Sequence, residues 1–116
     1  TCFVRPDTRI PFMAMPDAID ALLQLASAPR ERLTKTAYNL TAFSPTASEI
    51  CEVVEKAFPA ASVKWEVDQK RQRILDTWPA EVDDSAARRD WGFAPRYDFS
   101  SAFDDYLVPT IRERYR

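Results

Sequence analysis

Histidine is absent from this chain of 116 residues, and glycine occurs once, at Gly92. Without histidine, the chain cannot form a Ser-His or Cys-His catalytic pair, and it lacks the commonest general base of enzymes. A single glycine also excludes the glycine-rich loop that brings backbone N–H groups against the phosphates of a dinucleotide. We therefore expect no histidine-dependent catalysis and no cofactor-binding residue of the usual dinucleotide-binding kind in this segment.

Cysteine is nearly as scarce, with only Cys2 and Cys51. The two residues lie far apart in the sequence, and no histidine is available to join them in a metal site. We interpret each as a buried or idle thiol, and we expect no metal site.

An excess of positive charge is missing as well, because 16 lysines and arginines face 18 aspartates and glutamates, for a net charge of -2. Such a chain has no sequence-wide attraction to nucleic acid or to an anionic membrane surface. No apolar run approaches the roughly 20 residues that cross a bilayer, and the first residues lack the order of a signal peptide. We expect a soluble, cytoplasmic protein with no nucleic-acid partner and no membrane partner.

The chain does contain enough apolar sequence for one domain, since 46% of its residues are hydrophobic, and we treat 1–116 as a single segment. Apolar residues at helical spacing predict a helix over 18–28 with Asp17 as its N-cap. Thr46 and Glu49 form a capping-box pattern that begins a second helix, which Pro59 ends. The predicted apolar stripe of the first helix consists of Ile19, Leu22, Leu23 and Ala26.

Two more helices are predicted in the second half of the chain. A short one follows Asp84 or Ser85 as N-cap and ends at Gly92, which supplies the left-handed residue. A longer apolar stripe covers 99–111 and contains Pro109, which removes a backbone donor and costs roughly 3 kcal/mol inside a helix. We expect either a kink at Pro109 or a helix that starts again after it.

Three short segments have the composition of β-strands. Residues 2–4 and 37–40 are apolar runs bounded by polar turns, whereas 63–67 alternates apolar and charged residues with a period of two. Composition leaves the fold class open, and an α/β fold is what the family resemblance described below implies for these helices and strands.

The candidate binding residues surround an aromatic-proline corner. Lys70, Arg71 and Arg73 form a basic cluster that is either a solvated turn or a site for an anionic group, since arginine can hold a carboxylate or phosphate in a bidentate manner. Trp78 precedes a proline and is either core filler or the wall of a substrate pocket. Arg9 lies beside an apolar run and has a similar pair of interpretations, a structural role or a place at a substrate pocket. By contrast, we expect the aromatic residues on either side of Gly92 to pack a helix onto the core.

Four motifs in order resemble a known family. They are Arg-Pro-Asp-Thr-Arg-Ile-Pro-Phe-Met-Ala-Met-Pro-Asp-Ala-Ile at 5–19, Ala-Tyr-Asn-Leu-Thr-Ala-Phe-Ser-Pro-Thr at 37–46, Asp-Thr-Trp-Pro at 76–79, and Asp-Asp-Ser-Ala-Ala-Arg-Arg-Asp-Trp-Gly-Phe at 83–93. This order resembles the C-terminal part of the short-chain-type L-threonine 3-dehydrogenases, over nearly the whole chain. More loosely, it is similar to the extended short-chain dehydrogenases, which include nucleotide-sugar epimerases and dehydratases.

The resemblance implies a C-terminal substrate-binding lobe together with the last strand-helix units of a Rossmann-type extended short-chain dehydrogenase. The parent would use NAD to oxidise L-threonine to 2-amino-3-oxobutanoate. The family's glycine-rich fingerprint and its Tyr-x-x-x-Lys pair are missing here, because no tyrosine is followed by a lysine four residues later. We therefore expect a missing N-terminal Rossmann domain, a homodimeric parent, and a segment that binds no NAD and is inactive alone.

The resemblance also implies specific site residues. Arg9 and Met13 correspond to the base of the substrate cleft, Trp78 lies near the bound amino acid, and Thr77 is a neighbour that can donate a hydrogen bond. Arg71 and the nearby Arg73 remain possible anion-binding residues, and no catalytic residue is expected. Two alternatives remain, namely a nucleotide-sugar epimerase or dehydratase, and a stand-alone interaction module without enzymatic activity.

Overall fold

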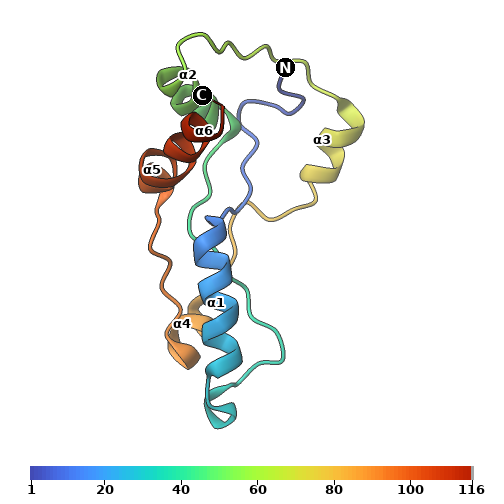
Figure 1. Cartoon of the computed structure of the whole chain (residues 1–116). Helices are drawn as coiled ribbons and strands as arrows, with labels where there is room; N and C mark the ends of the chain where they lie inside the picture. Colours follow the sequence, from blue (N-terminus) through green and yellow to red (C-terminus); the bar gives the residue numbers. More distant parts are fainter. Residues whose placement is uncertain (116) are drawn as a thin grey trace.

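The computed structural model describes residues 1–115 and consists of helices joined by long extended segments (Figure 1). The α-helices are α1 (Met15–Ser27), α2 (Ala47–Ala57), α3 (Gln69–Leu75), α4 (Ser85–Trp91), α5 (Phe99–Ser101) and α6 (Val108–Arg114). A 3₁₀ turn, η1 (Arg30–Arg32), follows α1, and a π-helical segment, η2 (Ala102–Leu107), joins α5 to α6. In Figure 1, α2, α5 and α6 lie together at one end of the molecule, and α4 lies beside α1 at the other.

The three predicted strands are extended but do not form a sheet within the described residues. Residues 2–4 and 63–67 meet in one parallel bridge between Cys2 and Trp65. No backbone group of 37–40 is hydrogen-bonded to another backbone group within 1–115. The prediction of strands was therefore wrong for this chain alone, because a strand needs a partner that continues over several residues.

Helix α1 begins three residues earlier than predicted. Its N-cap is Ala14, and Pro16 occupies the first turn, where a missing N–H costs nothing. Asp17 is buried instead of capping the helix, and its carboxylate accepts hydrogen bonds of 3.0 Å from the backbone N–H groups of Arg96 and Tyr97. The carboxylate thus fixes the loop after α4 against α1, and the prediction of Asp17 as N-cap was wrong.

Helix α2 has the predicted capping box. The Thr46 hydroxyl accepts from the Glu49 N–H at 3.2 Å, and the Glu49 carboxylate accepts from the Thr46 N–H at 2.7 Å. The latter hydrogen bond holds the pKa of Glu49 below its usual value. The helix ends at Ala57, just ahead of Pro59, as expected from the missing proline N–H.

The core of the molecule lies between α1 and α4. Trp91 and Phe93 are 8% and 3% exposed, and they pack with Ala21 and Ala87. Tyr38 meets the Trp91 ring edge-on, with ring centroids 5.9 Å apart. The structural role predicted for the two aromatic residues beside Gly92 is confirmed.

Gly92 ends α4 with φ 76°, the left-handed conformation predicted for it. Pro109 lies inside a helix whose preceding turns are widened: the N–H of Val108 donates to the carbonyl of Phe103, five residues earlier. Pro109 lies in the first turn of α6, where a missing N–H is tolerated. Helix α6 begins at Val108, directly after η2 and one residue before Pro109, so the expectation of a helix that starts again after Pro109 was wrong.

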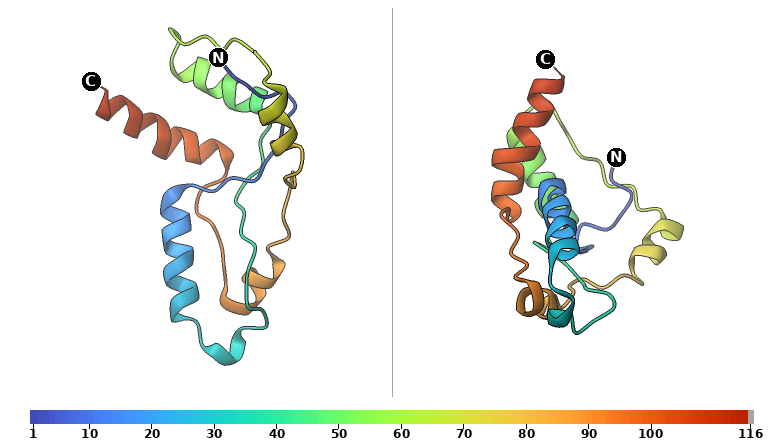
Figure 2. Two further views of the ribbon diagram at one scale, coloured as in Figure 1. Left: turned by 90° about the vertical axis from the view of Figure 1, so that its right-hand side faces the viewer. Right: turned by 60° about the horizontal axis from the view of Figure 1, so that its bottom comes forward.

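The molecule is elongated, with extents of 51 × 36 × 18 Å and a radius of gyration of 16.7 Å. A compact domain of this length has a radius of gyration of about 13 Å. Figure 2 shows the long segments between helices and the α3 unit joined to the rest by extended connections. The chain therefore closes only a small core.

Candidate functional site

Helix α3, where a charged turn was expected, presents the predicted aromatic corner. The Asp68 side chain caps it by accepting from the N–H groups of Lys70 at 2.9 Å and Arg71 at 3.2 Å. The helix has no apolar stripe, so periodicity could not reveal it. Asp68 was the only local signal, because aspartate is a favoured N-cap.

Gln72 attaches α3 to the N-terminal segment. Its side chain is 1% exposed and is the largest fully buried side chain among the described residues. Its Oε1 accepts from the N–H of Arg5 at 2.7 Å, and its amide exchanges hydrogen bonds of 3.2 and 3.1 Å with the Thr8 hydroxyl. Sequence reasoning missed Gln72, because both partners lie more than sixty residues away in the chain.

Asp76 forms the second attachment at the end of α3. Its carboxylate takes two hydrogen bonds from the Arg5 guanidinium, at 2.8 and 3.2 Å, and one of 2.8 Å from the Gln72 side-chain amide. The Arg5 hydrogen bond holds the pKa of Asp76 below its usual value, with Gln72 adding to the effect. The same contact raises the pKa of Arg5.

Thr77 and Trp78 follow directly and form the corner itself. The Thr77 hydroxyl donates to the carbonyl of Ile74 at 2.7 Å, and the Trp78 N–H donates to the carbonyl of Leu75 at 3.0 Å. The hydroxyl proton of Thr77 is therefore used inside α3, although its oxygen can still accept. The Trp78 side chain is 53% exposed, so within residues 1–115 it is not core filler.

Arg9 and Met13 line two neighbouring hollows. Exposed Arg9 borders a hollow of about 180 Å³, and half-buried Met13 borders an apolar cavity of about 230 Å³. Phe43 and Pro45 line both. Neither hollow includes the Trp78 corner, so the structure groups Arg9 with Met13 and leaves the corner apart from them.

The basic residues of α3 do not form one anion site with Arg9. The Arg71 guanidinium lies 4.8 Å from the centroid of the Phe3 ring, and its Nε is 3.7 Å from the Asp68 carboxylate. Arg73 is exposed on the same short helix. The contacts of Arg71 fit the solvated-turn reading better than the anion-binding one.

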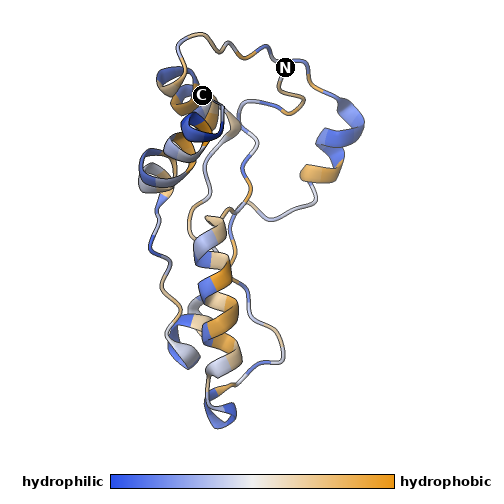
Figure 3. Cartoon of the chain, viewed as in Figure 1, coloured by the Kyte–Doolittle hydropathy of each residue, from blue (hydrophilic) through white to orange (hydrophobic). Residues whose placement is uncertain are grey.

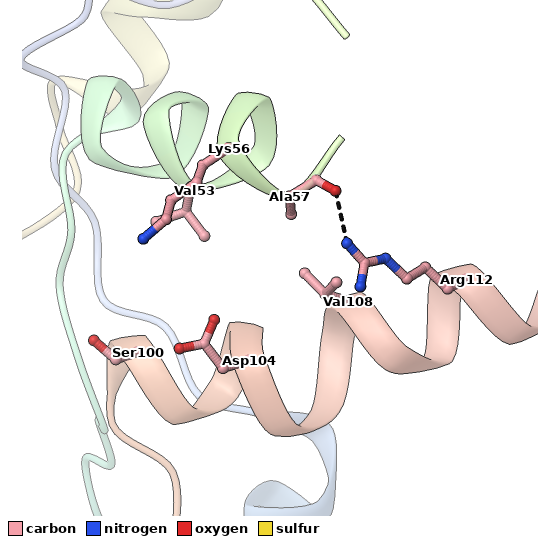
Figure 4. Close-up of a pocket in the computed structure, with 7 residues that line it drawn as sticks. All are labelled: Val53, Lys56, Ala57, Ser100, Asp104, Val108 and Arg112. Carbon is pink, nitrogen blue, oxygen red and sulfur yellow. Dashed lines mark hydrogen bonds between the residues drawn. The ribbon is translucent and has the colours of Figure 1, made fainter. Parts of the chain in front are cut away.

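A further groove of about 330 Å³ separates α2 from the C-terminal helix (Figure 4). Arg112 crosses it and donates to the carbonyl of Ala57 at 2.9 Å, which satisfies an end of α2. Lys56 and Asp104, which line the groove, are exposed. Arg112 thus joins two helices.

Residues 1–115 hold no candidate metal centre. No group of three acidic, cysteine or histidine side chains there lies close enough to hold a metal ion, and none of the helices in this range is long and apolar enough to cross a bilayer. Both cysteines are free and half-buried, and burial raises the pKa of the Cys51 thiol.

Known proteins align with almost the entire chain, although no protein-family model matches it. Bovine mitochondrial L-threonine 3-dehydrogenase is 42% identical over 97 residues, which are 84% of this chain and 26% of the relative. An epimerase/dehydratase of Staphylococcus haemolyticus is 36% identical over 115 residues, 98% of this chain and 36% of the relative. The chain is homologous to L-threonine 3-dehydrogenases and epimerase/dehydratases. The resemblance seen in the four motifs is thereby confirmed.

Solved structures of L-threonine dehydrogenases also superpose on the chain. The enzyme from Phytophthora infestans is 38% identical with a TM-score of 0.87, over 97% of this chain and 36% of that one. The enzyme from Clostridium difficile is 31% identical with a TM-score of 0.90, over 98% of this chain and 36% of that one. The chain thus spans about a third of the length of the proteins it matches, or less.

Proposed function

We propose that this chain is the C-terminal, substrate-side part of an NAD-dependent L-threonine 3-dehydrogenase, which oxidises the side-chain hydroxyl of L-threonine to give 2-amino-3-oxobutanoate. The observation that carries the proposal is the similarity to threonine dehydrogenases over nearly the whole chain, with 31–42% identity and TM-scores from 0.84 to 0.90. A cytoplasmic location and a dimeric parent remain predictions.

Uncovered apolar surface supports a second domain in the parent. Along one stripe of α1, the side chains of Ile19, Leu22 and Leu23 are 51%, 68% and 63% exposed, and Figure 3 shows the apolar residues of this helix in orange. Residues 37–40 are extended, with their backbone groups unpaired inside the described chain. A Rossmann domain supplies what both features lack, a surface for the helix and a neighbouring strand for the segment.

In this proposal, the residues that bind NAD belong to the part of the parent outside this chain. The one glycine, Gly92, closes α4 with φ 76° and does not precede a helix start, so the residues present do not fit a dinucleotide pyrophosphate. NAD supplies the hydride acceptor when bound to the parent. The residues of this chain would bind and orient the amino acid and exclude water around it.

An epimerase or dehydratase of the same superfamily is the alternative, favoured by the similarity to the staphylococcal protein. Such an enzyme would need Arg9 together with Arg71 or Arg73 around a diphosphate. The Arg71 guanidinium instead lies over Phe3 and beside Asp68. This arrangement favours the threonine reading. A stand-alone interaction module is disfavoured by the radius of gyration of 16.7 Å and the small core.

The test is a substrate comparison on the full-length protein. L-threonine with NAD should yield NADH, whereas a UDP-sugar should remain unchanged. Conversion of the UDP-sugar without threonine oxidation would replace the proposal by the alternative. Calorimetry of the isolated 116-residue chain should detect no NAD binding, and tight binding there would contradict the proposed division between the two parts.

Trp78→Ala tests the substrate side of the proposal. In the full-length enzyme it should raise the KM for L-threonine by about tenfold, because the wall that orients the amino acid is lost. Trp65→Phe is a matched aromatic control on a half-buried segment that lines neither the Arg9 hollow nor the Met13 cavity. Unchanged kinetics in Trp78→Ala, with threonine oxidation intact in the wild type, would remove Trp78 from the site without affecting the proposed reaction.

A further inference from the structure

The α3 clamp, which consists of Arg5, Thr8, Gln72 and Asp76, joins the two sides of the proposed substrate site. We infer that Gln72 and the Arg5–Asp76 ion pair are positioning residues, which hold the Trp78 corner in place for the amino-acid substrate. This inference rests on the proposed function. It assigns to these residues a role in substrate binding that they perform without touching the substrate.

The buried amide of Gln72 can be held in only one orientation. The Arg5 N–H is a donor only, so it requires Oε1 at 2.7 Å, and the Asp76 carboxylate is an acceptor only, so it requires Nε2 at 2.8 Å. The Thr8 hydroxyl donates a second hydrogen bond to Oε1 and accepts the second hydrogen bond from Nε2. Gln72 therefore has all its polar groups paired in the buried position.

Helix α3 depends on this amide for its placement. The helix has seven residues, too few to be stable alone, and Gln72 is its only buried residue. A large apolar residue near its end, Ile74, is 58% exposed. The hydrogen bonds of the clamp therefore set the orientation of α3 relative to the rest of the chain, together with half-buried Leu75 and the Arg71–Phe3 contact.

The Arg5–Asp76 pair adds direction at the end of the helix. Two hydrogen bonds between a planar guanidinium and a carboxylate fix both position and angle. Both side chains are partly exposed, at 46% and 42%, so the pair contributes little to global stability. The pair instead fixes the position of the chain near Trp78, because Asp76 is two residues before Trp78.

The other side of the clamp leads to Arg9. Residues 5–9 run along the start of α2, where the carbonyl of Thr8 accepts from the Ala47 N–H at 2.9 Å and Arg9 forms an antiparallel bridge with Thr46. A hydrogen-bonded path thus connects the Trp78 corner with the segment that carries Arg9 and Met13. Loosening the clamp would change the spacing between the corner and that segment.

The experiment uses Asp76→Asn in the full-length enzyme, with Asp84→Asn as a matched control. Asp84 makes a similar two-bonded pair with Arg88, at 2.8 and 2.8 Å, but on α4. Asp76→Asn should raise the KM for L-threonine by about tenfold with a smaller change in kcat, since small misplacements of orienting groups weaken substrate positioning. Asp84→Asn should leave both constants unchanged, and Asp76→Glu should restore part of the loss.

A double-mutant cycle between Asp76 and Trp78 distinguishes a positioning role from a general structural role. If Asp76 acts through Trp78, the double variant Asp76→Asn/Trp78→Ala should bind threonine no more weakly than Trp78→Ala alone. Additive losses, or equal losses in Asp76→Asn and Asp84→Asn, would overturn the inference. Arg5→Lys keeps the charge and removes the second bond, so it provides the same test if Asp76→Asn folds poorly.

Hydrogen exchange provides a readout that does not depend on turnover. The backbone amides of 74–78 should exchange faster in Asp76→Asn than in the wild type, and unchanged exchange would show that no clamp exists. A wild-type enzyme that leaves L-threonine unoxidised would overturn both the proposed function and the substrate role of the clamp. In that case, faster exchange would still establish the clamp as a structural device.

Discussion

The hydroxyl of Tyr38 donates a hydrogen bond of 2.8 Å to Oδ2 of Asp90. The same carboxylate oxygen accepts from the hydroxyl of Thr34 at 2.5 Å and from its N–H at 3.1 Å. Asp90 is 4% exposed, and the hydrogen bond from the Thr34 hydroxyl, followed by that from Tyr38, holds the pKa of its carboxyl far below the usual value. A charged group at the end of α4 thus anchors the segment that leads to 37–40.

Acid should weaken this anchor. Because the folded-state pKa of Asp90 lies below the unfolded value of about 3.9, its stabilisation is fully present above that pH and is lost progressively as the pH falls from there through the folded-state pKa. Asp90→Asn should lower the Tm at pH 7 and should narrow the difference in Tm between pH 7 and pH 3. Asp104→Asn, an exposed control, should retain the wild-type difference in thermal unfolding. An Asp90→Asn protein with the full wild-type pH dependence would contradict the assignment.

Gly92→Ala should lower the free energy of unfolding by about 1 kcal/mol, because alanine is disfavoured in the left-handed region. The cost is conformational only, since a Cβ built at Gly92 meets no heavy atom within 4 Å. Gly92→Asn should cost less, because asparagine tolerates that conformation. Denaturant unfolding of the two variants measures the difference, and equal losses would mean that φ is not the cause.

Thr46→Ala should destabilise the protein by about 1 kcal/mol, because the N–H of Glu49 loses the hydroxyl that caps α2. Thr36→Ala is the control, since Thr36 is exposed and lies outside any helix. Chemical denaturation should show the loss in the first variant and a change within about 0.5 kcal/mol in the second. A Thr36→Ala loss as large as that of Thr46→Ala would argue against the cap as its source.

The isolated 116-residue chain should self-associate through the exposed stripe of α1. Leu22→Glu with Leu23→Glu should shift it toward the monomer in sedimentation experiments, since the two side chains are 68% and 63% exposed there. In the full-length protein the same change should lower the Tm, because the stripe would be covered. Ile111→Glu, on the C-terminal helix, is the control. A stable monomer of the wild-type chain would favour the interaction-module alternative.

Local sequence determined the ends of several elements. The Thr46–Glu49 capping box and the end of α4 at Gly92 were both predictable, because each depends on atoms within about five residues of one another. The four ordered motifs similarly indicated the family, because a family pattern lies in the order of residues along the chain. The corner at Trp78 and the segment of Arg9 and Met13 entered the candidate site by that route.

Tertiary structure decided what depended on distant partners. The α3 clamp could not be predicted from the sequence, since the partners of Gln72 lie 64 and 67 residues away. Asp17 does not cap α1, because its carboxylate accepts hydrogen bonds from backbone N–H groups 79 and 80 residues later in the chain. The strand composition of 37–40 was not sufficient for a sheet, because backbone pairing needs a neighbouring strand and none lies beside it within 1–115.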